Sequence, residues 1–537
     1  MAKFDPRTKI LSSERLPQMY DPKISVGQVI LNVMFKEPNK VIQVSDDDGI
    51  EVTCSQMAEM MTNIAKNLFK IGLRSGDVAG ILGANTTYLS PAIFACLLLR
   101  LPMNPIEKSF DVNQIVNIFR ETRPKVVFCD HDVIDKLMTA LGILEIEARI
   151  VILTERIEGL FHISDFLQES YGYDEFIYKV NSSIETSLIV CTSGTSGHPK
   201  LALISHIQQL NVCIRTNNNN NEGVSFNVCS MYWAMGINYL IYKTLNAQKR
   251  LLTKKRFTPD LFFDLVEKYG VTETFLVPPH LMLLAESKRF QTANLNSLKC
   301  IFTGGLCVSE NIRRKINEKL LYGTVSVIYG TTEFCVLISE TLPDGPITSS
   351  VGIPTINTEV KIQLDDGTTG GVKEIGEILA RNTIKPLGYF KNTPKIKIDD
   401  EGWLHTGDMG FIDENFEINI IGQRTFAIRN YYNEIYPCEI ENKIEALSGI
   451  ERVCVVGLPD PIEIEIPAAL VIREINSNID ESVVMEITND LPSYKQLRGG
   501  IFFIDTLPLT PSGKLQRKEA KEIATRLKIE RESRMHT

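Results

Sequence analysis

The sequence has no long hydrophobic run. Its most apolar stretch, residues 92–99, ends at Arg100 and is far shorter than the roughly 18 residues that indicate a transmembrane helix. Residues 1–6 contain no apolar signal core, and the final residues, Met-His-Thr, differ from a Ser-Lys-Leu type of peroxisomal ending. We therefore expect an intracellular protein without a transmembrane segment.

Other patterns are missing as well. The eleven cysteines include no Cys-x-x-Cys pair, which argues against a zinc site or a disulfide framework and favours a reducing compartment. The net charge is −9 and no long basic run occurs, so nucleic acid is not an expected partner. An apolar share of 44% and a charged share of 23% exclude wholesale disorder. We expect a globular protein with small-molecule partners.

Short β-branched runs alternate with helix-like stretches through the first half of the chain. We expect buried strands at residues 78–83, 125–130, 150–153, 188–191, 274–277 and 299–302. A helix pattern covers residues 88–99, and we expect Asn85, Thr86 or Thr87 to cap this helix. The alternation predicts a largely parallel α/β fold.

The pattern changes after residue 345. Residues 367–371 and 374–379 are typical of antiparallel hairpins, and from about residue 423 the chain returns to mixed α/β character with many charges. We place a domain boundary there, which gives domains 1–422 and 423–537. Residues 217–221 are consecutive asparagines, which we interpret as a solvated loop.

A segment rich in Gly, Ser and Thr follows the fourth of these strands. Its hydroxyl groups donate hydrogen bonds, its glycines let the backbone approach a ligand, and a lysine adds positive charge, so its composition suits polyphosphate. It is not a Walker loop, because the sequence Gly-Lys-Ser/Thr is missing. A flexible turn without a ligand is the alternative. The candidate residues are Thr192, Ser193, Gly194, Thr195, Ser196, Gly197 and Lys200.

Four further motifs follow along the chain. Each supplies chemistry that a nucleotide or an acyl group needs: glycines after a strand, an aromatic face with hydroxyls and a carboxylate, a carboxylate followed by an arginine, and a lysine in a Pro-Ser-Gly-Lys turn. Taken alone, each also has an ordinary structural interpretation as a tight turn, a helix start or a surface charge. The residues are Gly304 and Gly305; Tyr329, Gly330, Thr331, Thr332 and Glu333; Asp408 and Arg424; and Lys514.

Together and in this order, these segments resemble the adenylate-forming superfamily, which includes acyl-CoA synthetases, firefly luciferases and peptide-synthetase adenylation domains. The resemblance covers about residues 25–520, and residues 497–503 and 507–510 are most similar to the insect luciferase-like fatty acyl-CoA synthetases. It implies an α/β fold with a large N-terminal domain of α/β subdomains and a small β-barrel-like subdomain. A small, mobile C-terminal α+β domain would follow.

The resemblance also implies a role for each residue. Tyr329 would stack on adenine, Thr332 would contact the α-phosphate, and Glu333 would be the magnesium ligand. Asp408 would accept hydrogen bonds from the ribose, while Arg424 would pair with ribose or phosphate. Lys514 would bridge the acyl carboxylate and the α-phosphate, as a catalytic residue together with Thr332, Glu333 and Lys200. The remaining implied ATP- or AMP-binding residues are the loop residues 192–197, Gly304, Gly330 and Thr331; Trp233, Gly304 and Gly305 would line the acyl pocket, and Gln423 would be the hinge.

The implied reaction is the ATP-dependent activation of a carboxylic acid, with a medium- or long-chain fatty acid as the expected substrate. The acid would form an acyl-adenylate and then a thioester with coenzyme A, so ATP, Mg²⁺ and coenzyme A are the expected cofactors and substrates. By family analogy the peroxisome is an expected location, and the cytoplasm is the other. No oligomeric state is predicted.

Two departures from the family pattern leave alternatives open. Within residues 425–433, the bulky Tyr432 stands where the family has a glycine that lets pantetheine pass. A nucleotide-binding pseudoenzyme, or an adenylating enzyme impaired in the coenzyme A step, is therefore an alternative. A luciferase-like monooxygenase is a less favoured one. Trp233 stands where many relatives have histidine, so we expect it to reshape or shorten the acyl pocket, although a core aromatic is an equal interpretation.

Overall fold

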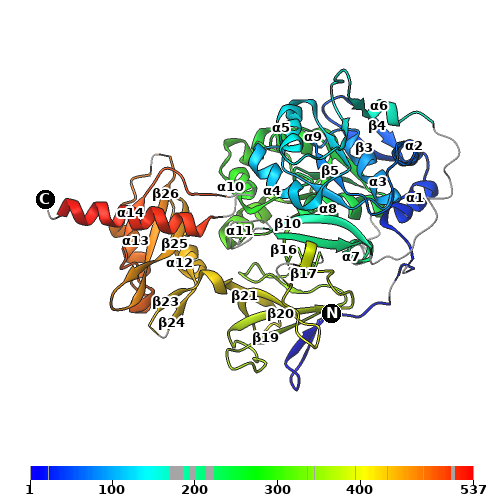
Figure 1. The fold of residues 1–537 in the computed structure, drawn as a ribbon. Helices are drawn as coiled ribbons and strands as arrows, with labels where there is room; N and C mark the ends of the chain where they lie inside the picture. The colour runs from blue at the N-terminus through cyan, green and yellow to red at the C-terminus, as the bar shows by residue number, and fades with distance from the viewer. Residues whose placement is uncertain are drawn as a thin grey trace.

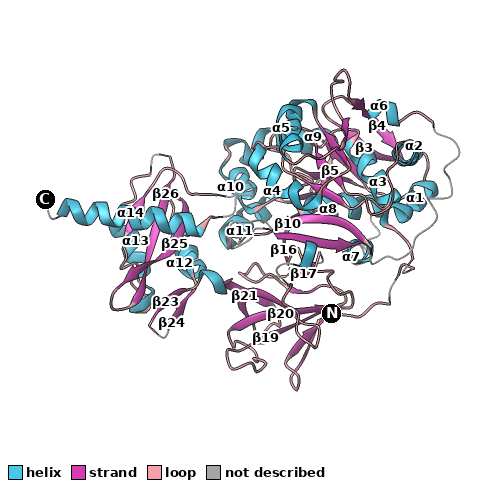
Figure 2. Ribbon diagram, viewed as in Figure 1, coloured by secondary structure: helices cyan, strands magenta, loops and turns pink. Residues whose placement is uncertain are grey.

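Four β-sheets organise the chain. The computed structural model describes residues 2–535 apart from residues 18, 22, 170–184, 193–199, 213–222, 307, 336, 344, 393–394, 432, 476 and 510–514. Three sheets form the larger, N-terminal part, and the fourth belongs to a smaller C-terminal part that lies to one side (Figure 1). Helices cover the first two sheets, whereas the third carries few (Figure 2).

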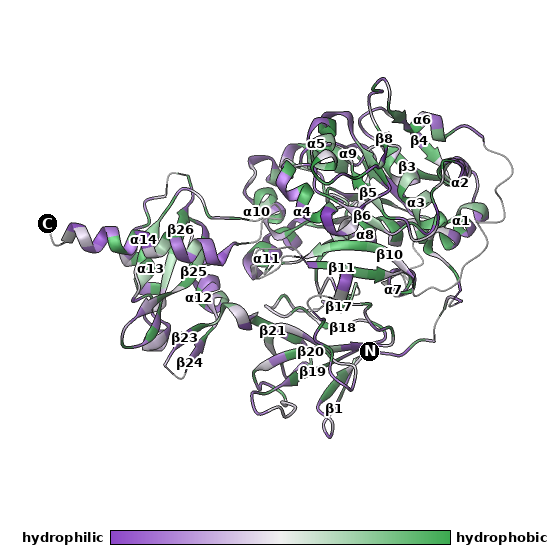
Figure 3. Ribbon diagram, viewed as in Figure 1, coloured by the Kyte–Doolittle hydropathy of each residue, from purple (hydrophilic) through white to green (hydrophobic). Residues whose placement is uncertain are grey.

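The first sheet is built from buried runs rich in β-branched residues. Its order is β11-β10-β6-β5-β7-β8-β9, and its strands are parallel except for β11. In Figure 3 these strands are coloured mainly as hydrophobic, while α14 carries long hydrophilic stretches. The strands are β5 (Ala79–Leu82), β6 (Met103–Pro105), β7 (Val126–Cys129), β8 (Arg149–Ile152), β9 (Phe161–His162), β10 (Thr186–Thr192) and β11 (Lys200–Ser205).

The helices beside this sheet include the most apolar one of the described chain. Every residue of α3 is buried, so the apolar run at 92–99 is a core helix, packed against α1 and α2. The predicted cap of α3 was wrong. Tyr88 is the N-cap residue, and its side chain makes no capping hydrogen bond. The hydroxyl of the preceding Thr87 donates to Asp48. The helices are α1 (Val26–Lys36), α2 (Cys54–Lys70), α3 (Leu89–Leu99), α4 (Val112–Thr122), α5 (Ile134–Ile143), α6 (Ile163–Phe166) and α7 (His206–Val212).

The second sheet has the order β18-β17-β16-β15-β14-β12-β13-β3-β4. Its central strands are parallel, and β4, β17 and β18 are antiparallel at its edges. Its strands are β3 (Val41–Ser45), β4 (Glu51–Thr53), β12 (Val224–Asn227), β13 (Lys249–Leu252), β14 (Val271–Phe275), β15 (Cys300–Gly304), β16 (Thr324–Gly330), β17 (Leu337–Glu340) and β18 (Ile353–Pro354). Its helices are α8 (Ala234–Leu245), α9 (Pro259–Tyr269), α10 (Pro278–Glu286) and α11 (Glu310–Lys319).

The third sheet is antiparallel, as the hairpin signals predicted. Its order is β1-β2-β19-β20-β21-β22, so the two N-terminal strands lie beside strands from the middle of the chain (Figure 1). Its strands are β1 (Lys3–Asp5), β2 (Ile10–Ser12), β19 (Thr358–Gln363), β20 (Gly376–Asn382), β21 (Leu404–Ile412) and β22 (Ile418–Gln423).

The C-terminal part begins just after β22. A single 3₁₀ turn, η5 (Arg424–Phe426), leads into a fourth sheet in which β23, β26 and β25 are neighbours, with β24 and β27 at its sides. The elements are β23 (Ile428–Asn430), β24 (Asn433–Ile435), β25 (Ile450–Asp460), β26 (Ile464–Arg473), β27 (Ile501–Phe503), α12 (Pro437–Glu445), α13 (Glu481–Thr488) and α14 (Arg517–Met535). The α/β architecture with a large and a small domain is thus confirmed. No helix in the described ranges is both long and apolar enough to cross a membrane.

Candidate nucleotide and acyl site

Two residues predicted to hold a nucleoside come together from different sheets. Tyr329 is the penultimate residue of β16, and Asp408 lies in β21. The Tyr329 hydroxyl donates to Asp408 Oδ2 at 2.7 Å, and both side chains are buried. Burial, reinforced by the Asp408 carboxylate, raises the pKa of Tyr329 well above its usual value, so its hydroxyl stays protonated. The contact fixes an aromatic ring and a carboxylate side by side.

A second carboxylate positions the strand that carries Asp408. Glu377 on β20 accepts from the backbone N–H of Gly407 at 3.1 Å and lies 3.2 Å from His405 Nδ1. Gln423, directly opposite Asp408 on β22, donates its side-chain amide to Asp408 Oδ1 at 3.1 Å. The predicted hinge residue therefore touches the predicted ribose ligand.

A third group of residues surrounds Glu333. The Tyr389 hydroxyl donates to Glu333 Oε1 at 2.5 Å, and Lys200 Nζ lies 5.6 Å from the centre of the Tyr389 ring. Burial, together with the Glu333 carboxylate, raises the pKa of Tyr389, which keeps it a donor. Tyr389 reaches this place because its backbone pairs with Ala202 at the edge of β11.

The turn between β16 and β17 is fixed by hydrogen bonds from a buried side chain. The amide of the buried Gln208 donates to the backbone oxygens of Glu333 and Phe334 at 3.2 and 3.4 Å. Among the described residues, the Thr332 hydroxyl has no hydrogen-bond partner. The turn thus carries a hydroxyl and a carboxylate, and Tyr389, which contacts the Glu333 carboxylate, has its ring near Lys200. Sequence reasoning missed Tyr389, Gln208 and Glu377, since no local pattern marks them.

Arg424 is held away from this group. It forms an ion pair with Asp365, in the turn that follows β19, and both side chains are largely exposed. Its sequence neighbour Gln423 contacts Asp408, so Arg424 directly follows a residue that touches the Tyr329–Asp408 pair. The structure therefore brings together Tyr329, Asp408 and Gln423, but not Arg424.

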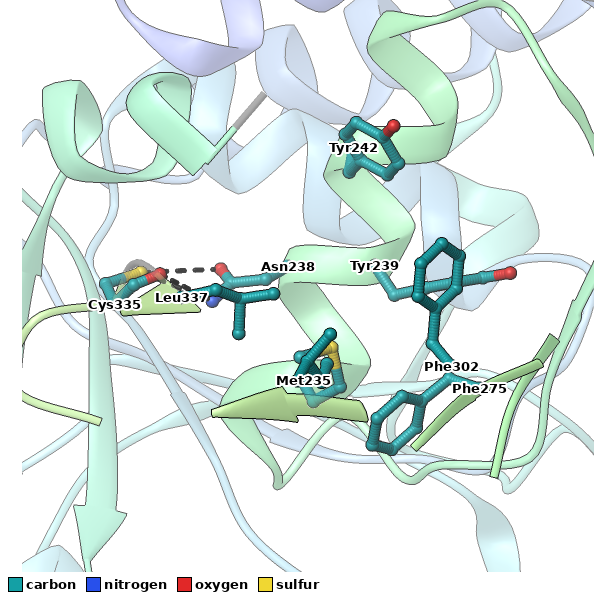
Figure 4. A pocket seen from close by; sticks show the side chains of 9 residues that line it. Met235, Asn238, Tyr239, Tyr242, Phe275, Phe302, Cys335 and Leu337 are labelled. Atoms are coloured by element: carbon teal, nitrogen blue, oxygen red, sulfur yellow. Dashed lines mark hydrogen bonds between the residues drawn. The ribbon is translucent and has the colours of Figure 1, made fainter. Parts of the chain in front are cut away.

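A small apolar cavity lies beside the Tyr329–Glu333 segment (Figure 4). One face of α8 and the strands β14, β15 and β16 form its walls, and its volume of about 40 Å³ holds no more than a few water molecules. Burial raises the pKa of the Cys335 thiol to about 12, so the thiol is a neutral wall group. The lining residues are Met235, Asn238, Tyr239, Tyr242, Phe275, Phe302, Ile328, Cys335 and Leu337.

None of the three predicted acyl-pocket residues lines this cavity. Trp233 is the N-cap residue of α8 and packs edge-on against Tyr232, two residues before Met235, the first α8 residue that lines the cavity. A Cβ on Gly304 would lie 2.3 Å from the Ile328 carbonyl oxygen, so glycine is needed there for strand packing. Gly305 has a φ of +85° with open space around it, which suits glycine in a tight turn.

Several other predicted residues lie outside the described part of the chain. For the glycine-rich loop, Thr192 and Lys200 face each other at the ends of β10 and β11, and Ser193, Gly194, Thr195, Ser196 and Gly197 lie between them, undescribed. For Lys514, the flanking Leu509 and Leu515 pair as an isolated antiparallel bridge. Tyr432 and the asparagine tract also lie outside the described residues.

The donor set around Glu333 fits magnesium. Hard carboxylate and hydroxyl oxygens suit Mg²⁺, which takes one or two protein carboxylates and completes its shell with water and substrate phosphates. In the described ranges, no three His, Cys, Asp or Glu side chains are grouped to hold a metal ion. A single carboxylate beside a candidate phosphate site would suit magnesium, which keeps several water ligands.

Comparisons with known proteins agree with this geometry. Residues 32–390 match the model of the AMP-binding enzymes, and residues 439–514 match that of the AMP-binding enzyme C-terminal domain. The chain is 26% identical to a probable 4-coumarate–CoA ligase of Dictyostelium discoideum, across 95% of this chain and 97% of that protein. It is 24% identical to the luciferin 4-monooxygenase of Photinus pyralis, across 89% and 90% of the two chains.

A solved structure shares the fold. An anthranilate CoA ligase in complex with anthranoyl-AMP superposes with a TM-score of 0.85 at 19% identity, covering 94% of this chain and 98% of that one. The family match covers more than half of the sequence and includes the Tyr329–Glu333 segment. The chain therefore belongs to the AMP-binding, adenylate-forming enzyme family, whose coenzyme A ligases use ATP, Mg²⁺ and coenzyme A.

Proposed function

We propose that this enzyme activates a carboxylic acid with ATP and transfers the acyl group to coenzyme A. The observation that carries the proposal is the meeting of Tyr329 with Asp408, next to the Glu333–Tyr389–Lys200 group. An aromatic ring beside a buried carboxylate suits a nucleoside, and a hydroxyl, a carboxylate and a lysine suit its phosphates.

In this proposal the acid's carboxylate attacks the α-phosphorus of ATP, and pyrophosphate leaves. The reactants repel each other because both are anionic, so the enzyme acts by positioning them and neutralising charge. Lys200, Thr332 and Lys514 provide donors to the phosphates, and Glu333 is the magnesium ligand. Asp408 binds the ribose, Arg424 pairs with ribose or phosphate, and rotation at Gln423 then moves domain 423–537 for the coenzyme A step.

The substrate acid has an apolar acyl part. The medium- or long-chain fatty acid predicted from the sequence stays a prediction, as does a location in the cytoplasm or peroxisome. An aryl acid is a second candidate, favoured by the four aromatic side chains that line the cavity, Tyr239, Tyr242, Phe275 and Phe302. The names of the 4-coumarate–CoA ligase relatives also support an aryl acid as substrate.

Pyrophosphate release tests this function. We would measure it with fatty and aryl acids, with and without coenzyme A, and assay the thioester separately. Release with thioester formation supports the proposal. Release without thioester would identify an enzyme impaired in the coenzyme A step, as the Tyr432 position suggests, and no release with any acid would indicate a pseudoenzyme. Light emission would point to a luciferase-like activity.

Tyr389→Phe is expected to weaken magnesium use. The substitution removes the hydroxyl that orients Glu333 but keeps the ring beside Lys200. Loss of such a supporting partner costs about tenfold or more in metal affinity, so we expect a rise of that size in the Mg²⁺ concentration for half-maximal pyrophosphate release. Tyr436→Phe is the matched control, since Tyr436 donates to Glu434 at 2.7 Å in the C-terminal part. Equal Mg²⁺ requirements in both variants would refute the role of Tyr389.

Asp365→Asn is expected to improve ATP binding. Arg424 must leave Asp365 to reach a nucleotide, and this exposed ion pair is worth at most about 1 kcal/mol. Its removal should therefore lower the KM for ATP by up to about fivefold, more strongly at low salt. Asp366→Asn is the control, because Asp366 accepts hydrogen bonds from Thr368. An unchanged or higher KM for ATP would show that Asp365 does not compete for Arg424.

A further inference from the structure

An ion pair with a buried lysine lies next to the apolar cavity. The Lys243 side chain on α8 is only 2% exposed and is paired with Glu273 on β14, whose side chain is 25% exposed. Lys243 Nζ also lies 5.2 Å from the ring centre of Tyr239, 4.9 Å from that of Tyr242 and 5.9 Å from that of Phe302. All three rings line the cavity (Figure 4). A lysine is rarely so deeply buried unless it is paired.

The directions of the secondary structure elements place this pair at the deep end of the cavity. Strands β14, β15 and β16 are parallel, and their carboxyl ends lead to Gly304 and to the Tyr329–Glu333 segment. Phe275 is at the carboxyl end of β14, and Glu273 is two residues earlier, hence on the same face and roughly 7 Å further from that end.

Helix α8 gives the same direction. It starts after the carboxyl end of β12 and returns along the sheet, so its later residues lie further from the Tyr329–Glu333 segment. Met235, Tyr239 and Lys243 are spaced four residues apart on one face of the helix. Lys243 is therefore about 12 Å deeper than Met235 along the axis of α8.

The Lys243–Glu273 pair would block an apolar acyl chain at this end of the cavity. To pass it, a chain would have to separate the buried Lys243 ammonium from the Glu273 carboxylate, which is costly for a charge that is itself buried. It would also have to displace the rings that enclose the ammonium group. A chain or ring that stops at Tyr239, Tyr242 and Phe302 meets no such obstacle.

We propose that Lys243, held by Glu273, sets the length limit of the acyl pocket, so that the enzyme prefers short-chain or single-ring acids to long-chain acids. The proposal rests on the carboxylate-activating function above and assigns the substrate class of the same site. It favours shorter acids than the medium- or long-chain fatty acids that the sequence predicted. Lys243 is a specificity-determining residue here, since it touches the walls of the pocket and not the reacting atoms.

The experiment measures kcat/KM for pyrophosphate release with straight-chain acids from butyrate to palmitate and with benzoate and cinnamate. For the unmodified enzyme, we expect kcat/KM for hexanoate to exceed that for palmitate by about 10² or more, because several methylenes do not fit. Comparable values for the two acids would overturn the proposal. No release with any acid would instead count against the proposed function, so the two failures are distinct.

Two variants test the ion pair itself. Lys243→Ala combined with Glu273→Gln removes both charges together and opens space behind Tyr239, so we expect the decanoate-to-hexanoate ratio of kcat/KM to rise about tenfold or more. Lys268→Ala is the matched control: Lys268 pairs with Asp46 and lies 4.7 Å over the Tyr269 ring, but it is exposed. A merely structural role of Lys243 would lower kcat/KM for all acids equally, and an unchanged ratio in the double variant would contradict the proposal.

Discussion

Lys514→Ala is expected to slow adenylate formation by a factor on the order of 10² or more. Lys514 is the proposed donor that bridges the acyl carboxylate and the α-phosphate, and charge builds between these two anions in the transition state. Loss of one preorganised donor in such a place costs that much in kcat. The measurement is single-turnover pyrophosphate release at saturating ATP and acid.

Two comparisons show whether the loss of rate is specific to Lys514 and to the adenylation step. Lys518→Ala removes an exposed lysine four residues further on, at the start of α14, and should leave the rate within about twofold. In the Lys514 variant, thioester formation from a supplied acyl-adenylate should be affected far less than adenylation. The attack of the carboxylate on the anionic α-phosphate belongs to the adenylation step and is already complete in the acyl-adenylate. Equal losses in both half-reactions, or a near-normal adenylation rate, would rule out the assigned role.

The sequence predicted those parts of the fold that depend on local patterns. The β-branched runs at 126–129 and 149–152 are strands of one parallel sheet, because continuous apolar runs bounded by turn residues are typical of strands buried on both faces. Short motifs also predicted Tyr329 and Asp408 as candidate site residues. Their direct hydrogen bond across 79 residues did not, since no local pattern reports which strands of two sheets meet.

Local sequence patterns do not reveal the remaining candidate residues, for the same reason. Tyr389 reaches Glu333 only because its backbone pairs with β11, and Lys243 looks like a surface lysine on a helix until Glu273 is placed beside it. Trp233 was expected in the acyl pocket because of its place in the motif. This assignment stays a prediction: α8 begins immediately after Trp233, and the turn of α8 that faces the apolar cavity carries Met235.

The C-terminal part depends on a buried ion pair at the start of α14. Arg517 binds Glu441 of α12 through two hydrogen bonds of 2.5 and 2.7 Å and also donates to the Val455 carbonyl at 3.0 Å. Burial alone would lower the pKa of Arg517, but the Glu441 carboxylate outweighs it and raises that pKa. Glu441 in turn accepts from the Val455 N–H at 2.7 Å. One pair thus joins α12, β25 and α14.

Arg517→Ala is therefore expected to destabilise this part by about 3–5 kcal/mol, because it leaves the Glu441 carboxylate buried and unpaired. Hydrogen exchange of β25 and α14 peptides in the full chain should quicken by about 10² to 10³, with N-terminal peptides unchanged. Arg531→Ala is the matched control, since it breaks a half-exposed pair with Glu481 on the same helix and should cost about 1 kcal/mol or less. Combining Arg517→Met with Glu441→Leu removes the unpaired charge and should restore most of the protection. If the two arginine variants exchange alike, the buried pair does not anchor α14.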